Sequence, residues 1–453
     1  MKTPVIDFIN KYIESDIARF HMPGHKGHVF TGFESFDITE IEGSGSLYSR
    51  EGAIAESEAN ATSLFGFGRT IFSAEGSSQC AKAMLYLARQ AALKSGNPGR
   101  TVIAGRNAHK SFIQGCALNG LDVSWLEVNS EKDEPASICS CVVTPESIDA
   151  ALDSSDEKPF AVYLTAPDYH GYSPDIAGIA KVCRKRGILL LVDNAHGAYL
   201  RFLTPSRHPV GLGAFMSCDS AHKTLPVLTG GAYLQLSKDV PEDIYLQAKI
   251  ALALFGSTSP SYLILQSLDL CNNYLAEGYG EKLAKFVKKL EILGDELNSY
   301  GWRPEPSDPL KLIFDTSSRG YTGREIAALL RRRKIECEFA DYQTLVLMVT
   351  PENTDEDMKR LAKAFKEIPV TDKKIPPLPK PNHPLRKAMS IREAVMSPNE
   401  TVMIDKSVGR ICASPAVSCP PEIPIAVSGE EIDEDAVRLM KAYGIKTVQV
   451  VIG

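Results

Sequence analysis

Residues Ile188–His196 read ILLLVDNAH, an unbroken apolar run that ends in a carboxylate, an amide and an imidazole. A second apolar run, AVYLTA, lies upstream at Ala161–Ala166. Between them, Ile176–Arg186 has helical spacing and stops at Gly187. Uninterrupted apolar strands are typical of parallel sheets that are covered on both faces. The strand–helix–strand order therefore predicts an α/β domain with a mainly parallel sheet.

The same alternation extends in both directions from this unit. Upstream, we expect helices at Ile54–Phe65, Gln79–Lys94 and Ser111–Leu118, and strands at Thr101–Gly105 and Asp122–Val128. Downstream, we expect two long helices at Val240–Leu254 and Tyr262–Tyr300, and a smaller α/β unit around a helix at Gly323–Arg333. A proline-rich linker at Ile368–Pro384 precedes a last module.

The composition is that of an ordinary soluble globular protein, with 44% hydrophobic and 23% charged residues. A formal net charge of −6 argues against a nucleic-acid-binding surface. The N-terminus lacks the apolar core of a signal peptide, and no run approaches the ~20 apolar residues of a membrane span. The ten cysteines form no Cys-x-x-Cys pair, and Cys139 and Cys141 are the closest two. Free thiols in a reducing, cytoplasmic compartment are expected.

Lys223 is the first candidate for chemistry, within Ser220-Ala221-His222-Lys223-Thr224. Burial lowers the pKa of a lysine, and a neutral amine can form an imine with an aldehyde. A solvated loop lysine is the alternative. Asp193 is the second candidate, because a carboxylate at the carboxyl end of a buried parallel strand lies where such sheets bind ligands. Helix capping or metal binding would explain it equally well.

Two further motifs follow strands. Glu75-Gly76-Ser77-Ser78-Gln79 precedes a long helix, and hydroxyls beside a helix N-terminus suit a phosphate, although capping alone would explain one serine. His109 follows the strand TVIAG and could stack on an aromatic ring or simply lie at the surface. The spacing of the strand-end histidines matches no metal motif, so no metal is predicted.

Together these motifs resemble the Orn/Lys/Arg decarboxylase family, pyridoxal-phosphate enzymes of fold type I related to aspartate aminotransferase. Other segments match the family in the same order. They are FHMPGHKG at Phe20–Gly27, DITEI at Asp37–Ile41, EGAI at Glu51–Ile54, LFG at Leu64–Gly66, TSPSYLILQSLD at Thr258–Asp269, and SIREAVMSPNETVMIDKSVGRICA with PPEIPIAVSGE near the C-terminus. The resemblance covers nearly the whole chain.

The resemblance implies an aspartate aminotransferase-like large domain with a mainly parallel sheet, a small α/β domain and a C-terminal α+β domain. The expected boundaries are an N-terminal arm at 1–50, the cofactor domain at 51–265, the small domain at 266–367, and the linker with the C-terminal domain at 368–453. It also implies a homodimer, or a larger assembly of dimers, with the site at the dimer interface.

Residue roles follow from the same resemblance. Lys223 would form the Schiff base with pyridoxal 5'-phosphate and return the proton to Cα. Asp193 would pair with the pyridinium nitrogen, with Ala195 under the ring and His109 stacked on its other face. His196 would support the site. The phosphate and its surroundings would be held by Ser77, Ser78, Gln79, Ser220 and His222, with Ser257 and Thr258 reaching the partner's phosphate.

The sequence departs from the family at a few positions. Gly43-Ser44-Gly45-Ser46-Leu47 stands where members usually carry two acidic residues, and Gln79 and TGGAYLQL are also unusual. A basic substrate needs a carboxylate at its far end, for which Glu42, Glu51 and Asp168 are available.

The leading hypothesis is decarboxylation of a basic amino acid, with arginine or lysine ahead of ornithine. The alternatives are a pyridoxal-phosphate lyase or decarboxylase acting on another amino acid, an aminotransferase, or a cofactor-binding regulatory protein without turnover.

Overall fold

The computed structural model describes residues 1–126, 141–155, 157–306, 308–369, 371–376, 385–415, 417–419 and 423–453. Cys139, the end of the strand expected at Asp122–Val128, and much of the proline-rich linker lie outside these residues. The chain divides into two compact units. Unit 1 comprises 1–104, 143–166 and 175–281, and unit 2 comprises 105–142, 167–174 and 282–453. The four expected domain boundaries stay a prediction.

Unit 1 is built around a sheet with helices packed on it. Its strands are β1 (Arg69–Ser73), β2 (Thr101–Ala104), β4 (Ala161–Thr165), β5 (Leu189–Asp193), β6 (Met216–Asp219) and β7 (Ala232–Leu236). Its helices are α1 (Pro4–Glu14), α2 (Ala53–Phe65), α3 (Gly76–Lys94), α5 (Pro145–Asp153), α6 (Ile176–Arg186), α7 (Ala221–Thr224), α8 (Glu242–Tyr245), α9 (Ala248–Leu254) and α10 (Tyr262–Ala276), with 3-10 turns at Ala198–Phe202 and Pro209–Leu212.

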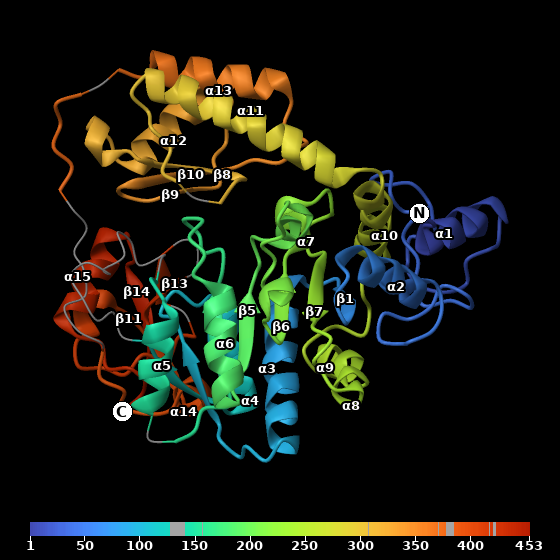
Figure 1. Ribbon diagram of the computed structural model, residues 1–453, viewed down its shortest axis with the longest axis horizontal. Coiled ribbons are helices and arrows are strands. Elements are labelled where there is room, and N and C mark those ends of the chain that lie inside the picture. The colour runs from blue at the N-terminus through green and yellow to red at the C-terminus, as the bar shows by residue number, and fades with distance from the viewer. Residues whose placement is uncertain are drawn as a thin grey trace. The chain divides into compact units, whose positions relative to one another are not determined.

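The strands of unit 1 lie in the order β1-β7-β6-β5-β4-β2, of which β1, β7, β6 and β5 are labelled in Figure 1. β2, β4, β5 and β6 run parallel, whereas β7 is antiparallel to β6 and β1 is antiparallel to β7. β4 and β5 are almost wholly buried, which agrees with their apolar sequences. The predicted mainly parallel sheet is confirmed.

Helix α6 begins and ends as its sequence predicts. The side chain of Asp175 accepts a hydrogen bond from the N–H of Gly178 and caps the first turn. Gly187 ends the helix with a φ of +67°, a left-handed conformation that glycine adopts without steric cost. These two caps fix the connection between β4 and β5.

Both long helices expected downstream prove to be interrupted. The segment expected as one helix at Tyr262–Tyr300 forms α10 and α11 (Tyr279–Ser299), because Gly278 takes a φ of +87° that a right-handed helix cannot accommodate. The helix expected at Val240–Leu254 starts only after Pro241 and is divided into α8 and α9 by a turn at Leu246 and Gln247.

Unit 2 contains most of α11, a three-stranded sheet and the C-terminal part of the chain. Its strands are β3 (Asp122–Trp125), β8 (Lys311–Asp315), β9 (Phe339–Ala340), β10 (Thr344–Met348), β11 (Asn399–Met403), β12 (Val417–Cys419), β13 (Ile423–Ala426) and β14 (Thr447–Val451). Its other helices are α4 (Lys110–Asn119), α12 (Gly323–Arg332), α13 (Asp355–Glu367), α14 (Ile391–Met396) and α15 (Glu434–Ala442), with 3-10 turns at Ser317–Arg319 and Ile404–Lys406.

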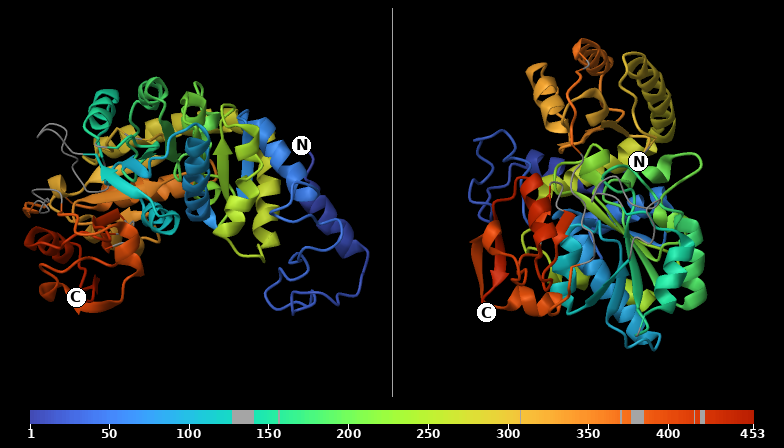
Figure 2. Two further views of the ribbon diagram at one scale, coloured as in Figure 1. Left: turned by 90° about the horizontal axis from the view of Figure 1, so that it is seen from below. Right: turned by 90° about the vertical axis from the view of Figure 1, so that its left-hand side faces the viewer.

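One hydrophobic core joins the parts of unit 2. β8, β10 and β9 form an antiparallel sheet, and α11, α12 and α13 lie on the same side of it (Figures 1 and 2). Ile313 and Val346 of this sheet belong to the same buried cluster as Ile404, Val437 and Val450 of the C-terminal segment. The small sheet and the C-terminal segment therefore fold as one body.

Candidate functional site

The carboxyl ends of β5 and β6 place the strongest candidates at one edge of the unit 1 sheet. Asp193 is the last residue of β5, and Asp219 is the last residue of β6. Because the two strands are parallel and adjacent, the loops that follow them emerge at the same edge. One of these loops carries Asn194, Ala195 and His196, and the other leads through Ser220 into α7.

Lys223 lies in α7 and contacts a histidine of the neighbouring loop. Its Nζ is 3.1 Å from Nε2 of His196. Lys223 is half-buried, and His196 is buried. Tertiary structure thus brings together two residues that are 27 positions apart in the sequence. An amine held against an imidazole in a protected loop is suited to exchange a proton with a bound ligand.

The carboxylate of Asp193 is buried and hydrogen-bonded. Its Oδ2 accepts a bond of 3.1 Å from the hydroxyl of Tyr163, and its Oδ1 accepts one of 3.2 Å from the N–H of Ala195. The Sγ of Cys218 lies 3.6 Å from Oδ1. These partners fix the direction of the carboxylate. Our sequence reasoning missed Tyr163, whose only signal was a polar hydroxyl inside the apolar run of β4.

The N-terminus of α3 lies beside the loop that precedes Lys223. The hydroxyl of Ser220 donates a 2.8 Å hydrogen bond to that of Ser77. Ser77 and Ser78 are half-buried in the first turn of α3, where backbone N–H groups have no partner within the helix. Free N–H groups and hydroxyls at a helix N-terminus form a favourable place for a phosphate.

Gln79 is oriented differently from the two serines. Its buried side chain accepts a bond from Ser73 Oγ and donates to the carbonyl of Leu252 and the hydroxyl of Tyr48. A Cβ at Gly256 would lie 2.0 Å from Nε2 of Gln79, so a larger residue there would displace this amide. The amide of Gln79 therefore supports the chain that leads to the exposed residues Ser257 and Thr258.

Of the two remaining sequence candidates, one lies in each unit. His222 in unit 1 has Nδ1 2.9 Å from the carbonyl of Gly231, and burial lowers its pKa. His109 belongs to unit 2, where it is the N-cap of α4 and its Nδ1 accepts a hydrogen bond from the N–H of Ser111. Within the described residues, no group of three His, Cys, Asp or Glu side chains could hold a metal ion.

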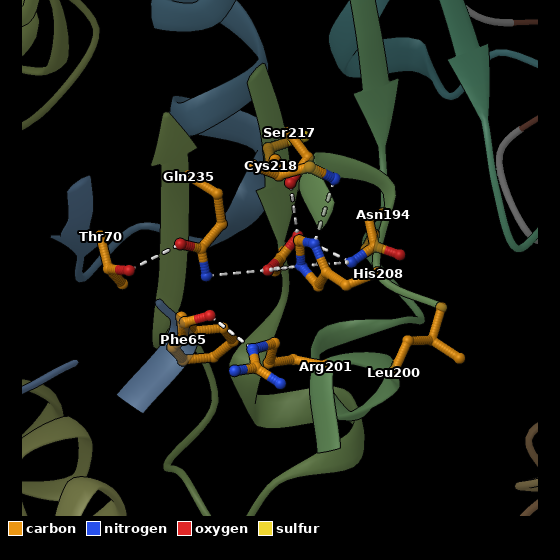
Figure 3. Close-up of polar contacts among 12 residues, drawn as sticks. Phe65, Thr70, Asn194, Leu200, Arg201, His208, Ser217, Cys218 and Gln235 are labelled. Carbon is orange, nitrogen blue, oxygen red and sulfur yellow. Dashed lines mark hydrogen bonds and ion pairs between the residues drawn. The ribbon is translucent and has the colours of Figure 1, made fainter. Parts of the chain in front are cut away.

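Asp219 is a second residue that sequence reasoning missed, although it directly precedes Ser220. Its carboxylate is fully buried and accepts hydrogen bonds from polar side chains of two strands and two loops, all four of which are labelled in Figure 3. The donors to this carboxylate are Asn194 Nδ2 at 2.8 Å, His208 Nε2 at 2.9 Å, Gln235 Nε2 at 3.1 Å and Ser217 Oγ at 3.1 Å. Four donors satisfy the buried negative charge.

The residues of unit 1 fit pyridoxal phosphate. Lys223 is a half-buried lysine whose amine could react with the cofactor's aldehyde, and Asp193 is a buried carboxylate that could pair with the ring nitrogen. The contact between Ser77 and Ser220 gathers hydroxyls at a helix N-terminus for its phosphate.

Known proteins share this architecture. An arginine decarboxylase from Halalkalibacterium halodurans is 27% identical over 462 residues, which cover 96% of this chain and 91% of that protein. The crystal structure of a lysine decarboxylase from Francisella novicida matches with a TM-score of 0.79 and 18% identity, over 99% of this chain and 81% of that chain. An alanine–glyoxylate aminotransferase from Nostoc matches with a TM-score of 0.54 and 17% identity, over 69% and 85%. The aminotransferase-like fold is confirmed.

Two family models match along the chain. The Orn/Lys/Arg decarboxylase major domain matches residues 3–299, and the C-terminal domain of the same family matches residues 370–445. These matches confirm the resemblance seen in the sequence, together with the enzyme class and the cofactor that it implied. The chain belongs to the Orn/Lys/Arg decarboxylase family and is a pyridoxal-phosphate-dependent amino acid decarboxylase.

Proposed function

We propose that this protein removes the α-carboxylate of a basic L-amino acid, arginine or lysine before ornithine, and releases the amine and carbon dioxide. The observation that carries the proposal is the contact between Lys223 and His196, whose loop begins directly after the buried Asp193 at the end of β5. The relative from H. halodurans is named an arginine decarboxylase, and the Francisella structure is that of a lysine decarboxylase. These names support a basic substrate.

Pyridoxal phosphate, when bound, supplies an electron sink for the charge left at Cα. Lys223 would hold the cofactor and deliver a proton from Nζ to Cα. Asp193 would keep the proton on the ring nitrogen, and its hydrogen bonds from Tyr163 and Ala195 hold it in place. His196 would orient the amine of Lys223.

The other site residues would bind and orient the cofactor. Ala195 would pack beneath the ring, and His109 would stack on its other face. Ser77, Ser78, Ser220 and His222 would surround the phosphate, and Gln79 would support this region through its bond to Leu252. Ser257 and Thr258 would reach the phosphate of a second subunit.

Glu42, Glu51 and Asp168 are the carboxylates proposed for a cationic substrate side chain. Glu42 and Glu51 are exposed. Asp168 is buried, and its Oδ1 accepts a 2.9 Å bond from the N–H of Tyr172 within a turn. In the Gly43–Leu47 segment, where the family resemblance led us to expect acidic residues, Ser44 is buried and donates a 2.8 Å bond to the carbonyl of Ile41. Ser44 therefore stabilises a turn and carries no negative charge for a cationic substrate. A panel of amino acids identifies the substrate directly.

We also propose a cytoplasmic homodimer. The N-terminal arm exposes large apolar side chains, with Phe20 97%, Phe30 79% and Phe33 63% exposed. Exposed aromatic side chains gathered in one segment are typical of a surface that another protein covers. The eight cysteines whose thiols the structure describes are free, as expected for a reducing compartment. No helix in the described ranges is long and apolar enough to span a membrane.

The function is tested on the purified protein loaded with pyridoxal phosphate. Visible absorbance should disappear on borohydride treatment, and Lys223→Ala should lack the borohydride-fixed cofactor. A panel of L-amino acids is then assayed for carbon dioxide and amine. Release of both from arginine or lysine supports the proposal. Keto acid consumption without carbon dioxide would indicate transamination, and bound cofactor with no product from any amino acid would indicate a regulatory protein.

A further inference from the structure

The pair Asp219–His208 connects the two loops that carry the proposed cofactor residues. Asp219 ends β6 and is followed directly by the segment leading to Lys223. Through Oδ1 it binds the side chain of Asn194, the residue next to Asp193 at the end of β5. One carboxylate therefore fixes both strand ends, and with them the separation between the amine of Lys223 and the carboxylate of Asp193.

His208 contacts the other oxygen of this carboxylate. Its Nδ1 accepts a 3.3 Å bond from the N–H of Val210, so the ring proton lies on Nε2 and is donated to Oδ2 of Asp219. The ring is fully buried and packs against Phe67, with centroids 4.6 Å apart. Packing and two hydrogen bonds thus restrict the imidazole to one orientation.

The network continues beyond the carboxylate to the far edge of the sheet. Gln235 of β7 donates to Asp219 and accepts a 2.7 Å bond from the hydroxyl of Thr70 of β1 (Figure 3). Gln235, Asp219 and His208 each have no exposed surface. A charged group enclosed in this way costs free energy unless every partner is in place, so the arrangement permits little movement.

We propose that Asp219 and His208 are positioning residues of the decarboxylase: they set the geometry of Asp193 and Lys223 without touching the cofactor. The inference rests on the function proposed above. Catalytic groups displaced by about 1 Å lose on the order of 10²-fold in rate. Loss of the Asp219 charge should therefore impair turnover more than substrate binding.

The experiment compares Asp219→Asn with Asp269→Asn in the full-length protein. Asp269 is a suitable control because it is also fully buried in unit 1 and accepts hydrogen bonds, from Ser57 Oγ and the N–H groups of Val5 and Ile6. Asp219→Asn should lower kcat by about 10–100-fold with KM within threefold, and should change the visible circular dichroism of the bound cofactor. Asp269→Asn should leave kcat and the cofactor signal within twofold of the wild-type values.

A second pair of variants keeps the test decisive if Asp219→Asn fails to fold. His208→Gln retains a donor for Asp219 and should preserve the cofactor signal, whereas His208→Phe removes the donor and should alter it. Wild-type kcat and circular dichroism in folded Asp219→Asn or His208→Phe would overturn the inference. The two proposals can fail separately. A wild-type protein that binds the cofactor but releases no carbon dioxide refutes the proposed function. In that case the visible circular dichroism of the cofactor in the variants still tests the positioning role.

Discussion

The guanidinium of Arg106 and the carboxylate of Glu430 form a two-point ion pair across 324 positions of sequence. Nη1 lies 2.5 Å from Oε1, and Nη2 lies 2.7 Å from Oε2. Glu430 also accepts a 2.8 Å bond from the N–H of Val427. Within unit 2, this pair attaches the segment that precedes His109 to the C-terminal part of the chain. Bidentate arginine–carboxylate pairs are among the stronger hydrogen-bonded ion pairs.

Glu430→Gln should loosen this segment. The guanidinium of Arg106 would then face a neutral amide, and we expect a loss of about 3 kcal/mol in stability and faster amide hydrogen exchange at residues 106–111. Glu431→Gln is the matched control, because Glu431 pairs with Arg386, whose side chain is 73% exposed. Equal exchange rates in the two variants would contradict a role for the Arg106–Glu430 pair.

Asp193→Ala should keep the borohydride-reducible cofactor but lose turnover by on the order of 10²–10³-fold, because the ring nitrogen loses its anionic partner. Tyr163→Phe removes one hydrogen bond to Asp193 and leaves the carboxylate, so a fall of about tenfold is expected. Single-turnover kinetics with the substrate found in the panel measure both effects. Unchanged turnover in Asp193→Ala would exclude its assignment to the ring nitrogen.

Asp269 should make stability depend on pH. Burial raises the pKa of its carboxyl to about 6 even though it accepts hydrogen bonds from Ser57 Oγ and the N–H groups of Val5 and Ile6. Since the folded protein then binds a proton more tightly than the unfolded chain, this contribution to stability is complete below about pH 4. It is lost as the pH rises through about 6.

Thermal unfolding between pH 4 and pH 7.5 tests this expectation. On going to the higher pH, the wild-type protein should lose up to about 3 kcal/mol of stability relative to Asp269→Asn. Asp295→Asn, at an exposed position, serves as the control. Parallel stability curves for the wild type and Asp269→Asn would show that the carboxyl titrates normally.

Removing one partner of the buried ion pair between Lys249 and Glu58 should destabilise unit 1. Their side chains are 7% and 9% exposed, with Nζ 2.5 Å from Oε1, and Lys249 also donates to the carbonyl of Leu47. Glu58→Gln leaves a buried ammonium without its counter-ion, at an expected cost of about 3–5 kcal/mol in denaturant unfolding.

The double variant Glu58→Gln with Lys249→Met removes that uncompensated charge and should recover most of the loss. Asp243→Asn breaks an ion pair between exposed side chains, with Lys94, and should have no measurable effect. A double variant that is no more stable than Glu58→Gln would mean that the charge is not the cause.

The sequence by itself determined the elements whose signals are local. Apolar runs predicted β4 and β5. Helix α6 lies between its N-cap Asp175 and its C-cap Gly187, both residue types that favour these positions. It also located the motifs around Asp193 and Lys223, because polar residues directly after buried strands are visible in one dimension. The break between α10 and α11 was less visible, since a single glycine, Gly278, decides it through its backbone conformation.

Only the tertiary structure decided which of these residues meet. The contact of Lys223 with His196, the hydroxyl of Tyr163 on Asp193, and the carboxylate of Asp219 among its four donors all join separate strands or loops. No local pattern records such pairs, because a hydrogen bond between distant positions depends on strand order and register rather than on neighbouring residues. Gln79 shows the same limit: its place in the EGSSQ motif predicted a role at the phosphate or its surroundings, but gave no sign that its amide donates to the carbonyl of Leu252 in α9.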